Sequence, residues 1–282
     1  MSWDRFRPAV LGASVVAALA AASPAQGQAR LDARYVVTLA GLPIGKGAWV
    51  VDLAEDQFTA AASGATTGLL QVFASGTGSG ASRGFVVGGK PTPASFASSV
   101  TSNRKTEEIR ITIVGGNVKD FAVTPPVNPS PERIPMTDAH RVAVNDPITA
   151  ALFRVSGSGD PMRPEACQRS VSVFDGRMRY DLKLAFKRMD RVKADRGYEG
   201  PVAVCSVQFL PIAGYVPARA AIKYLVERRD MEIWLAPIAA TRVVVPFRIV
   251  IPTPLGQGVL EATQFVAAPQ KPRAAASGPK TQ

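Results

Sequence analysis

The sequence predicts a mainly β protein, an antiparallel curled sheet or partly open β-barrel with one short helix. Most segments after residue 33 alternate apolar and polar residues or form short β-branched runs, and a period of two is typical of strands that bury one face. The 24 Gly and 23 Pro residues divide the chain into short segments and disfavour a helical bundle. About ten strands at short spacing fit a curled sheet or barrel.

The first thirty residues have the pattern of an export signal. A basic start precedes a charge-free apolar run over residues 9–22, which is shorter than the about 20 residues that a membrane-spanning helix needs. Small residues then permit cleavage after Ala25 or after Ala29. We therefore expect residues 1–29 to be a signal peptide and the mature chain to be a soluble periplasmic protein, because no later apolar stretch reaches spanning length.

Export changes the interpretation of the two cysteines. In an oxidising compartment Cys167 and Cys205 form an even pair with one possible connectivity, so a disulfide is predicted. A loop of this length is stabilised by about 4 kcal/mol in the chain-entropy model. The alternative is two buried free thiols. If the segments that hold the cysteines are neighbours in the sheet, the bond clamps the central hairpin to the strand after it.

The N-terminal half is expected to be a series of hairpins. Residues 63–89 are rich in Gly, Ser and Thr, with short apolar pieces at residues 69–73 and 85–87. The one predicted helix begins at residue 146, where Asp146 suits the N-cap and Pro147 the first helical position. Strands are predicted over residues 33–39, 47–53, 57–61, 108–114 and 118–123.

The clearest strand covers residues 177–187, where apolar and polar side chains alternate. Asp175-Gly176 before it suits a two-residue turn. Residues 218–229 fit a helix by their alanines or a strand by their alternation, and the strand is favoured. Residues 267–282 lack core residues and are expected to be a disordered tail, which leaves one domain over residues 30–266. The remaining strands are predicted at residues 171–174, 202–210, 231–235, 241–251 and 258–265.

One motif matches a hydrolase pattern. Residues 80–84 read G-x-S-x-G, which in hydrolases places a nucleophilic serine on a sharp strand-to-helix turn. Here the nucleophile would be Ser82, but a strand pattern follows it, and His140 is the only histidine available as a base. A chance match in a Gly- and Ser-rich segment is the interpretation that we favour, so no catalytic residue is assigned.

Metal and cofactor chemistry has little support in the sequence. One His and two Cys are too few for most zinc, haem and iron–sulfur sites. The glycines of residues 76–80 lack the Lys-Ser/Thr ending of a phosphate loop. No cofactor and no metal site is therefore expected.

The net charge of +11 includes one dense basic stretch. Inside a cell it would suggest nucleic acid. Outside the cell the available anions are lipid phosphates, lipopolysaccharide and acidic glycans, although a solvated loop would have the same composition. The candidate anion-binding patch consists of Lys187, Arg188, Arg191, Lys193 and Arg196.

Much of the mature chain resembles the DUF3108 family of uncharacterised exported bacterial proteins. The resemblance implies a secreted β-rich domain and supplies no reaction, so no catalytic residue is transferred. It depends on residues 35–47 with their GLPIG turn, 173–182 (VFDGRMRYDL), 232–237 (EIWLAP), 245–248 (VPFR) and 252–256 (PTPLG).

These observations leave three functional hypotheses. The leading one is a non-enzymatic periplasmic protein that supports the cell envelope by binding an amphiphilic anion or an envelope partner, since a curled sheet with a dry concave face suits a lipid-like ligand. The others are a periplasmic hydrolase and a purely structural interaction module. The sequence does not define the oligomeric state.

Overall fold

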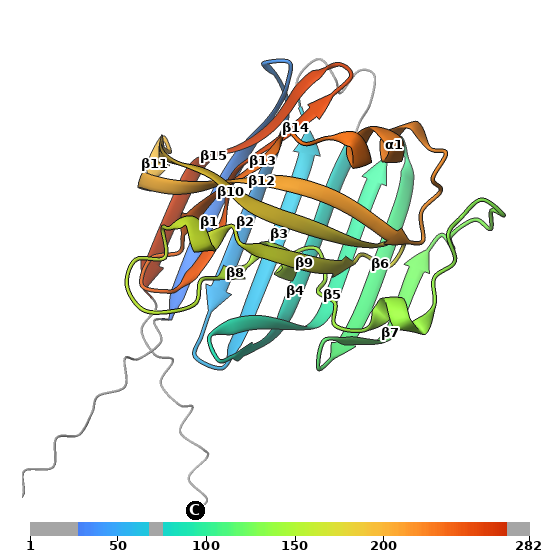
Figure 1. The fold of residues 1–282 in the computed structure, drawn as a ribbon, viewed down its shortest axis with the longest axis horizontal. Coiled ribbons are helices and arrows are strands. Elements are labelled where there is room, and N and C mark those ends of the chain that lie inside the picture. The colour runs from blue at the N-terminus through green and yellow to red at the C-terminus, as the bar shows by residue number, and fades with distance from the viewer. Residues whose placement is uncertain (1–27, 68–75, 270–282) are drawn as a thin grey trace, which may run out of the picture.

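The computed structural model describes residues 28–67 and 76–269, which form one continuous sheet with a single α-helix (Figure 1). Most of the predicted signal peptide, residues 69–73 and residues 270–282 of the predicted tail lie outside the described residues. The first half of the sheet contains β1 (Ala29–Leu39), β2 (Leu42–Leu53), β3 (Gln57–Thr66), β4 (Gly76–Val87), β5 (Lys90–Ser102), β6 (Lys105–Val114) and β7 (Asn117–Thr124). The second half contains β8 (Phe153–Arg154), β9 (Arg169–Phe174), β10 (Arg179–Lys193), β11 (Arg196–Gly197), β12 (Glu199–Ala213), β13 (Met231–Pro237), β14 (Val243–Thr253) and β15 (Gly256–Pro269).

The sheet curls over itself without closing into a barrel. Its strand order is β7-β6-β5-β4-β3-β2-β1-β15-β14-β13-β12-β10-β9, with β8 on β14 and β11 on β15. The end strands β7 and β9 are not paired with each other. In Figure 1, β10 and β12 cross in front of the first half. Phe174 of β9 belongs to the same buried cluster as Phe96 of β5 and Ile111 of β6. The predicted fold class is confirmed.

The hairpins of the first half form where the sequence has turn residues. Ala40 and Gly41 join β1 to β2 with φ of 49° and 83°. Gly115 and Gly116 join β6 to β7 with φ of 57° and 79°. Glycine adopts this left-handed region without steric cost. The strands predicted at residues 33–39, 47–53, 57–61, 108–114 and 118–123 are all present, with longer bounds.

Strand β5 was not predicted. Its sequence contains Pro91 and Pro93 and few large apolar residues, which are unfavourable signals for a strand. The register with β4 shifts next to Gly84, where a Cβ atom would lie 2.0 Å from the Thr92 carbonyl oxygen. Glycine is required at this close approach, and the irregularity accommodates the prolines.

The single α-helix was predicted in the wrong place. Residues 218–229 contain α1 (Ala220–Glu227) rather than a strand, consistent with the helix propensity of their Ala, Leu, Lys and Glu residues. The helix predicted from residue 146 is reduced to the 3₁₀ turn η3 (Thr149–Ala151). Asp146 lies just before this turn and stabilises its start, since its Oδ1 accepts the N–H groups of Ile148 and Thr149 at 2.9 and 3.0 Å.

The central hairpin β9–β10 is present, but its turn is displaced by one residue from the prediction. The closing pair is Asp175 and Met178, so the two turn residues are Gly176 and Arg177. Gly176 has φ of 89°. The Asp175 carboxylate accepts the N–H groups of Arg177 and Met178, which fixes the turn.

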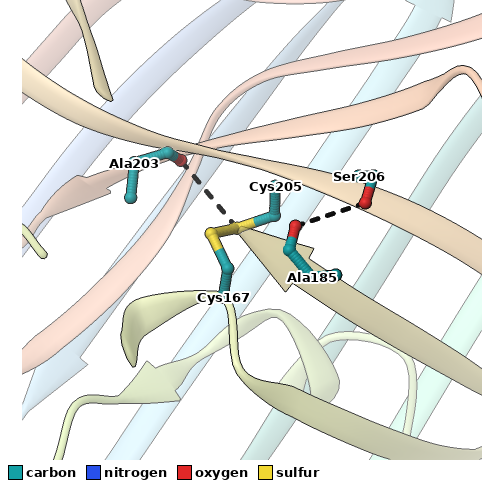
Figure 2. The surroundings of a disulfide bond; sticks show 5 residues. All are labelled: Cys167, Ala185, Ala203, Cys205 and Ser206. Atoms are coloured by element: carbon teal, nitrogen blue, oxygen red, sulfur yellow. Dashed lines mark hydrogen bonds between the residues drawn. A yellow bond between two sulfur atoms is a disulfide. The ribbon is translucent and has the colours of Figure 1, made fainter. Parts of the chain in front are cut away.

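The predicted disulfide joins Cys167 to Cys205, with a Cα–Cα distance of 5.3 Å and both residues fully buried (Figure 2). Cys205 lies on β12, and Cys167 follows the 3₁₀ turn η4 (Pro164–Ala166). The strands β9 and β12 are not neighbours, because β10 lies between them. The condition of neighbouring strands is therefore not met, and the bond ties the segment before β9 to β12 across β10.

The two predicted boundaries of the domain also shift. Strand β15 continues to Pro269, so residues 267–269 belong to the sheet and not to the tail. At the other end, Ala29 is fully buried and pairs with both Leu53 and Pro269. The ordered sheet therefore begins one residue before the predicted domain start at Arg30.

Candidate ligand-binding site

The first two residues of the predicted basic patch bind a carboxylate on the neighbouring part of the sheet. Lys187 and Arg188 contact Glu232 with N···O distances of 2.5 and 3.1 Å. The Trp234 indole N–H donates to the same carboxylate at 2.9 Å. Burial of Glu232 opposes its ionisation, but the hydrogen bonds from Lys187, Arg188 and Trp234 outweigh this effect and lower its pKa to about 2. Arg188 also pairs with Asp190 at 3.2 Å, so each of the two cations has a carboxylate partner within the protein.

The rest of the predicted patch is exposed along β10 and the turn after it. Lys193 pairs with Glu199 at 3.0 Å. Among the residues that the structure describes, no ion pair joins Arg191 or Arg196 to a carboxylate. The structure therefore does not gather the five residues into a pocket. Two of them remain as open surface charges.

Ser82 of the G-x-S-x-G motif lies on β4 and is only 2% exposed. Its hydroxyl donates to the Asp146 carboxylate at 2.9 Å and lies 2.8 Å from the Thr149 hydroxyl. Burial raises the pKa of Asp146, while the hydrogen bonds from Thr149, Ser82 and Ile148 oppose that rise. This buried network fixes the 145–152 segment against β4.

His140 makes its hydrogen bonds within its own turn. Its Nδ1 accepts the Thr137 N–H at 3.1 Å, and its partners in the described structure do not include Ser82. Within residues 28–67 and 76–269, no group of three or more His, Cys, Asp or Glu residues is placed to hold a metal ion. In the same part of the chain, no helix is long and apolar enough to cross a membrane.

A cavity of about 480 Å³ lies beside the β2–β3 and β4–β5 turns and beneath the loop after β8. We call it the apolar cavity, because most of its wall is apolar. Two arginines, Arg154 and Arg242, also line it. The apolar wall includes Leu53, Val86, Pro91, Pro161 and Val243.

Arginine side chains hold the loop over the apolar cavity. The Arg242 guanidinium donates to the carbonyl oxygens of Val155, Ser156 and Gly159 at 2.9, 3.0 and 2.5 Å. Burial, together with the nearby cations Arg163 and Arg154, lowers the pKa of Arg242, and the Asp160 carboxylate opposes this effect. The region therefore carries clustered positive charge.

A second cavity, of about 280 Å³, adjoins the first and is more polar. Arg154 lines both cavities, and Lys90 of the second is next in the chain to Pro91 of the first. Lys90, Arg154 and Arg169 line the second cavity, and its lining contains no carboxylate. We call it the cationic cavity.

Sequence reasoning missed both cavities. The arginines at positions 154, 163, 169 and 242 stand apart in the chain, and a search for dense basic runs passes over such residues. The fold brings them together through the short pairing of β8 with β14 and the loop that follows β8. Gly157 and Gly159 of that loop indicate a turn in the sequence, but they do not indicate which charged residues the loop brings together.

Fold and site together define a class of protein, a curled and open antiparallel β-sheet with adjoining apolar and cationic cavities beside one turn region. Residues 34–263 match the family model DUF3108, described as "Protein of unknown function", and the chain belongs to that family. No curated protein matches the chain. Its structure is similar to the crystal structure of a beta-barrel-like protein of the domain of unknown function DUF1849 from Brucella abortus. That similarity has a TM-score of 0.44 at 6% sequence identity and covers 88% of this chain and 100% of the other.

Proposed function

We propose that the protein is exported to the periplasm and supports the cell envelope by binding an amphiphilic anion. The observation that carries this proposal is the apolar cavity with Arg154 and Arg242 in its wall. Its volume of about 480 Å³ lies within the range of roughly 300–1,000 Å³ that is usual for small-molecule sites. An aliphatic chain gains by leaving water for the apolar wall, while the guanidinium groups favour a negative head group.

Two features support export. The chain begins with the basic and apolar pattern of a signal peptide. The structure also contains the Cys167–Cys205 disulfide and no free cysteine among the described residues, as is typical of proteins that fold in an oxidising compartment.

Displacement of a fluorescent fatty acid by dodecanoate tests the binding proposal. Val86 lines the cavity, whereas the adjacent Val87 is 63% exposed and does not. Val86→Phe should fill the cavity and weaken dodecanoate binding at least tenfold, because the chain loses several buried CH₂ groups at about 0.8 kcal/mol each. Val87→Phe is the matched control and should bind as the parent does. Equal binding by both variants would refute the cavity as the site.

The charge contribution needs its own pair of variants. Arg154→Gln should weaken dodecanoate binding by about tenfold, the loss expected for one charge-assisted hydrogen bond. Arg110→Gln is the control, since Arg110 lies on the exposed surface and pairs with Glu108 at 3.4 Å. Arg154→Gln and Arg110→Gln should bind dodecanol equally, because dodecanol is uncharged and forms no ion pair with Arg154.

The hydrolase hypothesis has a weaker basis in the structure. Ser82 is buried and donates to a carboxylate, so its hydroxyl is held by a network that stabilises packing. A serine-reactive fluorophosphonate probe should therefore not label the protein. Labelling of the parent, with its loss in Ser82→Ala, would favour a hydrolase.

The two remaining predictions from the sequence stay predictions. Arg191 and Arg196 are exposed, and contact of these two cations with an anionic membrane surface is predicted as a second attachment. A purely structural interaction module predicts that no lipid co-purifies. Native mass spectrometry of protein prepared from the envelope distinguishes these possibilities, and we expect a bound species with the mass of an anionic amphiphile.

A further inference from the structure

Arg169 is a half-buried cation that lacks a carboxylate partner. One of its terminal nitrogens donates to the Arg154 carbonyl oxygen at 3.2 Å, and its guanidinium lies 5.2 Å from the centre of the Phe153 ring. Its Nε–H is buried and has no hydrogen-bond partner in the described structure. A buried donor left without a partner costs about 1–3 kcal/mol, so the protein itself does not fully satisfy this guanidinium.

Two further cations without a carboxylate partner lie near Arg169. Lys90 and Arg154 line the same cationic cavity, and among the described residues neither forms an ion pair with a carboxylate. Ser156 and Ser170, each with a hydroxyl group, also line the cavity. Three cations and two hydroxyl groups around one cavity are donors that match the oxygens of a phosphate.

The nearby acidic group is already fully engaged. Asp146 is adjacent through Thr149, which lines the cavity. Both of its carboxylate oxygens accept hydrogen bonds, from Ser82 and Thr149 on one oxygen and from two backbone N–H groups on the other. This carboxylate therefore has no direction free toward the three cations. Burial also lowers the pKa of Arg169, in agreement with its half-buried position and its lack of a carboxylate partner.

We infer that the cationic cavity binds a phosphate group, with Arg154 and Arg169 as its principal donors and Lys90 at its mouth. The phosphate comes either from a lipid head group or from free phosphate. The lipid source rests on the proposed function, because a chain attached to the phosphate would pass Arg154 into the apolar cavity. The phosphate site itself does not depend on that function.

Isothermal titration with inorganic phosphate at low ionic strength tests the site. We expect saturable binding that weakens as salt is added. Arg154→Gln and Arg169→Gln should each weaken it about tenfold. Because a half-buried arginine can also contribute to folding, Lys90→Gln is the safer variant, since Lys90 is exposed, and it should weaken binding about threefold. Arg110→Gln should bind as the parent does. Absence of saturable binding, or equal binding by all four variants, would overturn the site.

A second titration identifies the source of the phosphate. Dihexanoyl phosphatidate is compared with inorganic phosphate in the parent and in Val86→Phe. At least tenfold tighter binding of the lipid, lost in Val86→Phe, supports the site with a lipid head group. Equal binding of both probes, unchanged in Val86→Phe, supports the site with free phosphate and refutes its lipid source. Dodecanoate binding without any phosphate binding would overturn the phosphate site and leave the proposed function intact.

Discussion

Removal of the Asp146 carboxylate should destabilise the protein, because buried hydrogen-bond donors lose their acceptor. Asp146 is fully buried and accepts hydrogen bonds from Ser82, Ile148 and Thr149, the last through both its N–H and its hydroxyl group. In Asp146→Ala the two hydroxyl groups can bond to each other, since they already lie 2.8 Å apart. The two backbone N–H groups have no such substitute.

The expected magnitude follows from those two groups. Each orphaned buried donor costs about 1–3 kcal/mol, and loss of a desolvated carboxylate returns part of that cost. We therefore expect Asp146→Ala to lower the free energy of unfolding by about 3 kcal/mol at pH 7. Asp146→Asn keeps one oxygen for the two N–H groups and should lose about 1 kcal/mol. Urea denaturation followed by tryptophan fluorescence measures both values.

The pH dependence of the same variants checks the assigned cause. Burial raises the pKa of Asp146 above its ordinary value of 3.8, so the folded state binds the proton more tightly than the unfolded state. The stability that protonated Asp146 contributes is fully present below the pKa of Asp146 in the unfolded chain. It is lost as the pH rises through the pKa of Asp146 in the folded protein. The advantage of the parent over Asp146→Asn should therefore shrink as the pH rises above 3.8.

Two outcomes would refute this explanation. One is a change below about 0.5 kcal/mol in Asp146→Ala, which is the usual effect of a surface substitution. The other is an advantage over Asp146→Asn that grows as the pH rises, because the carboxylate would then be stabilised by its surroundings. Asp120→Ala, at an exposed position on β7, is the control and should leave the free energy of unfolding nearly unchanged.

Three further predictions concern other parts of the fold. Cys167→Ser, Cys205→Ser and the double variant should lose similar stability, about 2–5 kcal/mol, and two titratable thiols in the denatured, unreduced parent would show that no bond exists. Glu232→Gln should lower the unfolding midpoint at pH 7 but not near pH 2. The reason is that the pKa of Glu232 is lowered from 4.5 to about 2, so the stability that its carboxylate contributes is lost as the pH falls through that range. An equal loss at both pH values would contradict the ion-pair assignment. N-terminal sequencing of exported protein should return Gln26, because Ala29 is fully buried in β1, whereas a start immediately after Ala29 would show that this pairing is dispensable.

The sheet was predictable where side chains alternate in size and polarity. Residues 177–187 identify β10 because the period of two is a direct consequence of strand geometry. Strand β5 has no such signal, since its small residues and prolines pair through a register shift at Gly84 that depends on close backbone approach. The helix α1 shows the opposite failure, because apolar residues at Ile222, Tyr224 and Val226 satisfy a strand period while the backbone is helical.

The candidate site was less predictable than the sheet, for a different physical reason. A dense basic run such as residues 187–196 is conspicuous in sequence, but three of its cations pair with carboxylates: Lys187 and Arg188 with Glu232, and Lys193 with Glu199. The three cations of the cationic cavity that form no ion pair with a carboxylate among the described residues, Lys90, Arg154 and Arg169, instead stand far apart in the chain. Only the curl of the sheet and the crossing of the loop after β8 decide which charges remain unpaired.

The disulfide and the cationic cavity belong to one local arrangement. Strand β8 consists of two residues, so the segment from β8 to β9 has little sheet pairing to hold it. The Cys167–Cys205 bond fixes the end of that segment to β12, and the Arg169 N–H donates to the Cys167 carbonyl oxygen at 2.9 Å. The crosslink and the pairing of Arg169 with Leu184 of β10 therefore together fix the backbone that carries the Arg169 guanidinium. A protein that must keep a desolvated arginine unpaired needs such a restraint, because a mobile segment would let that side chain return to water.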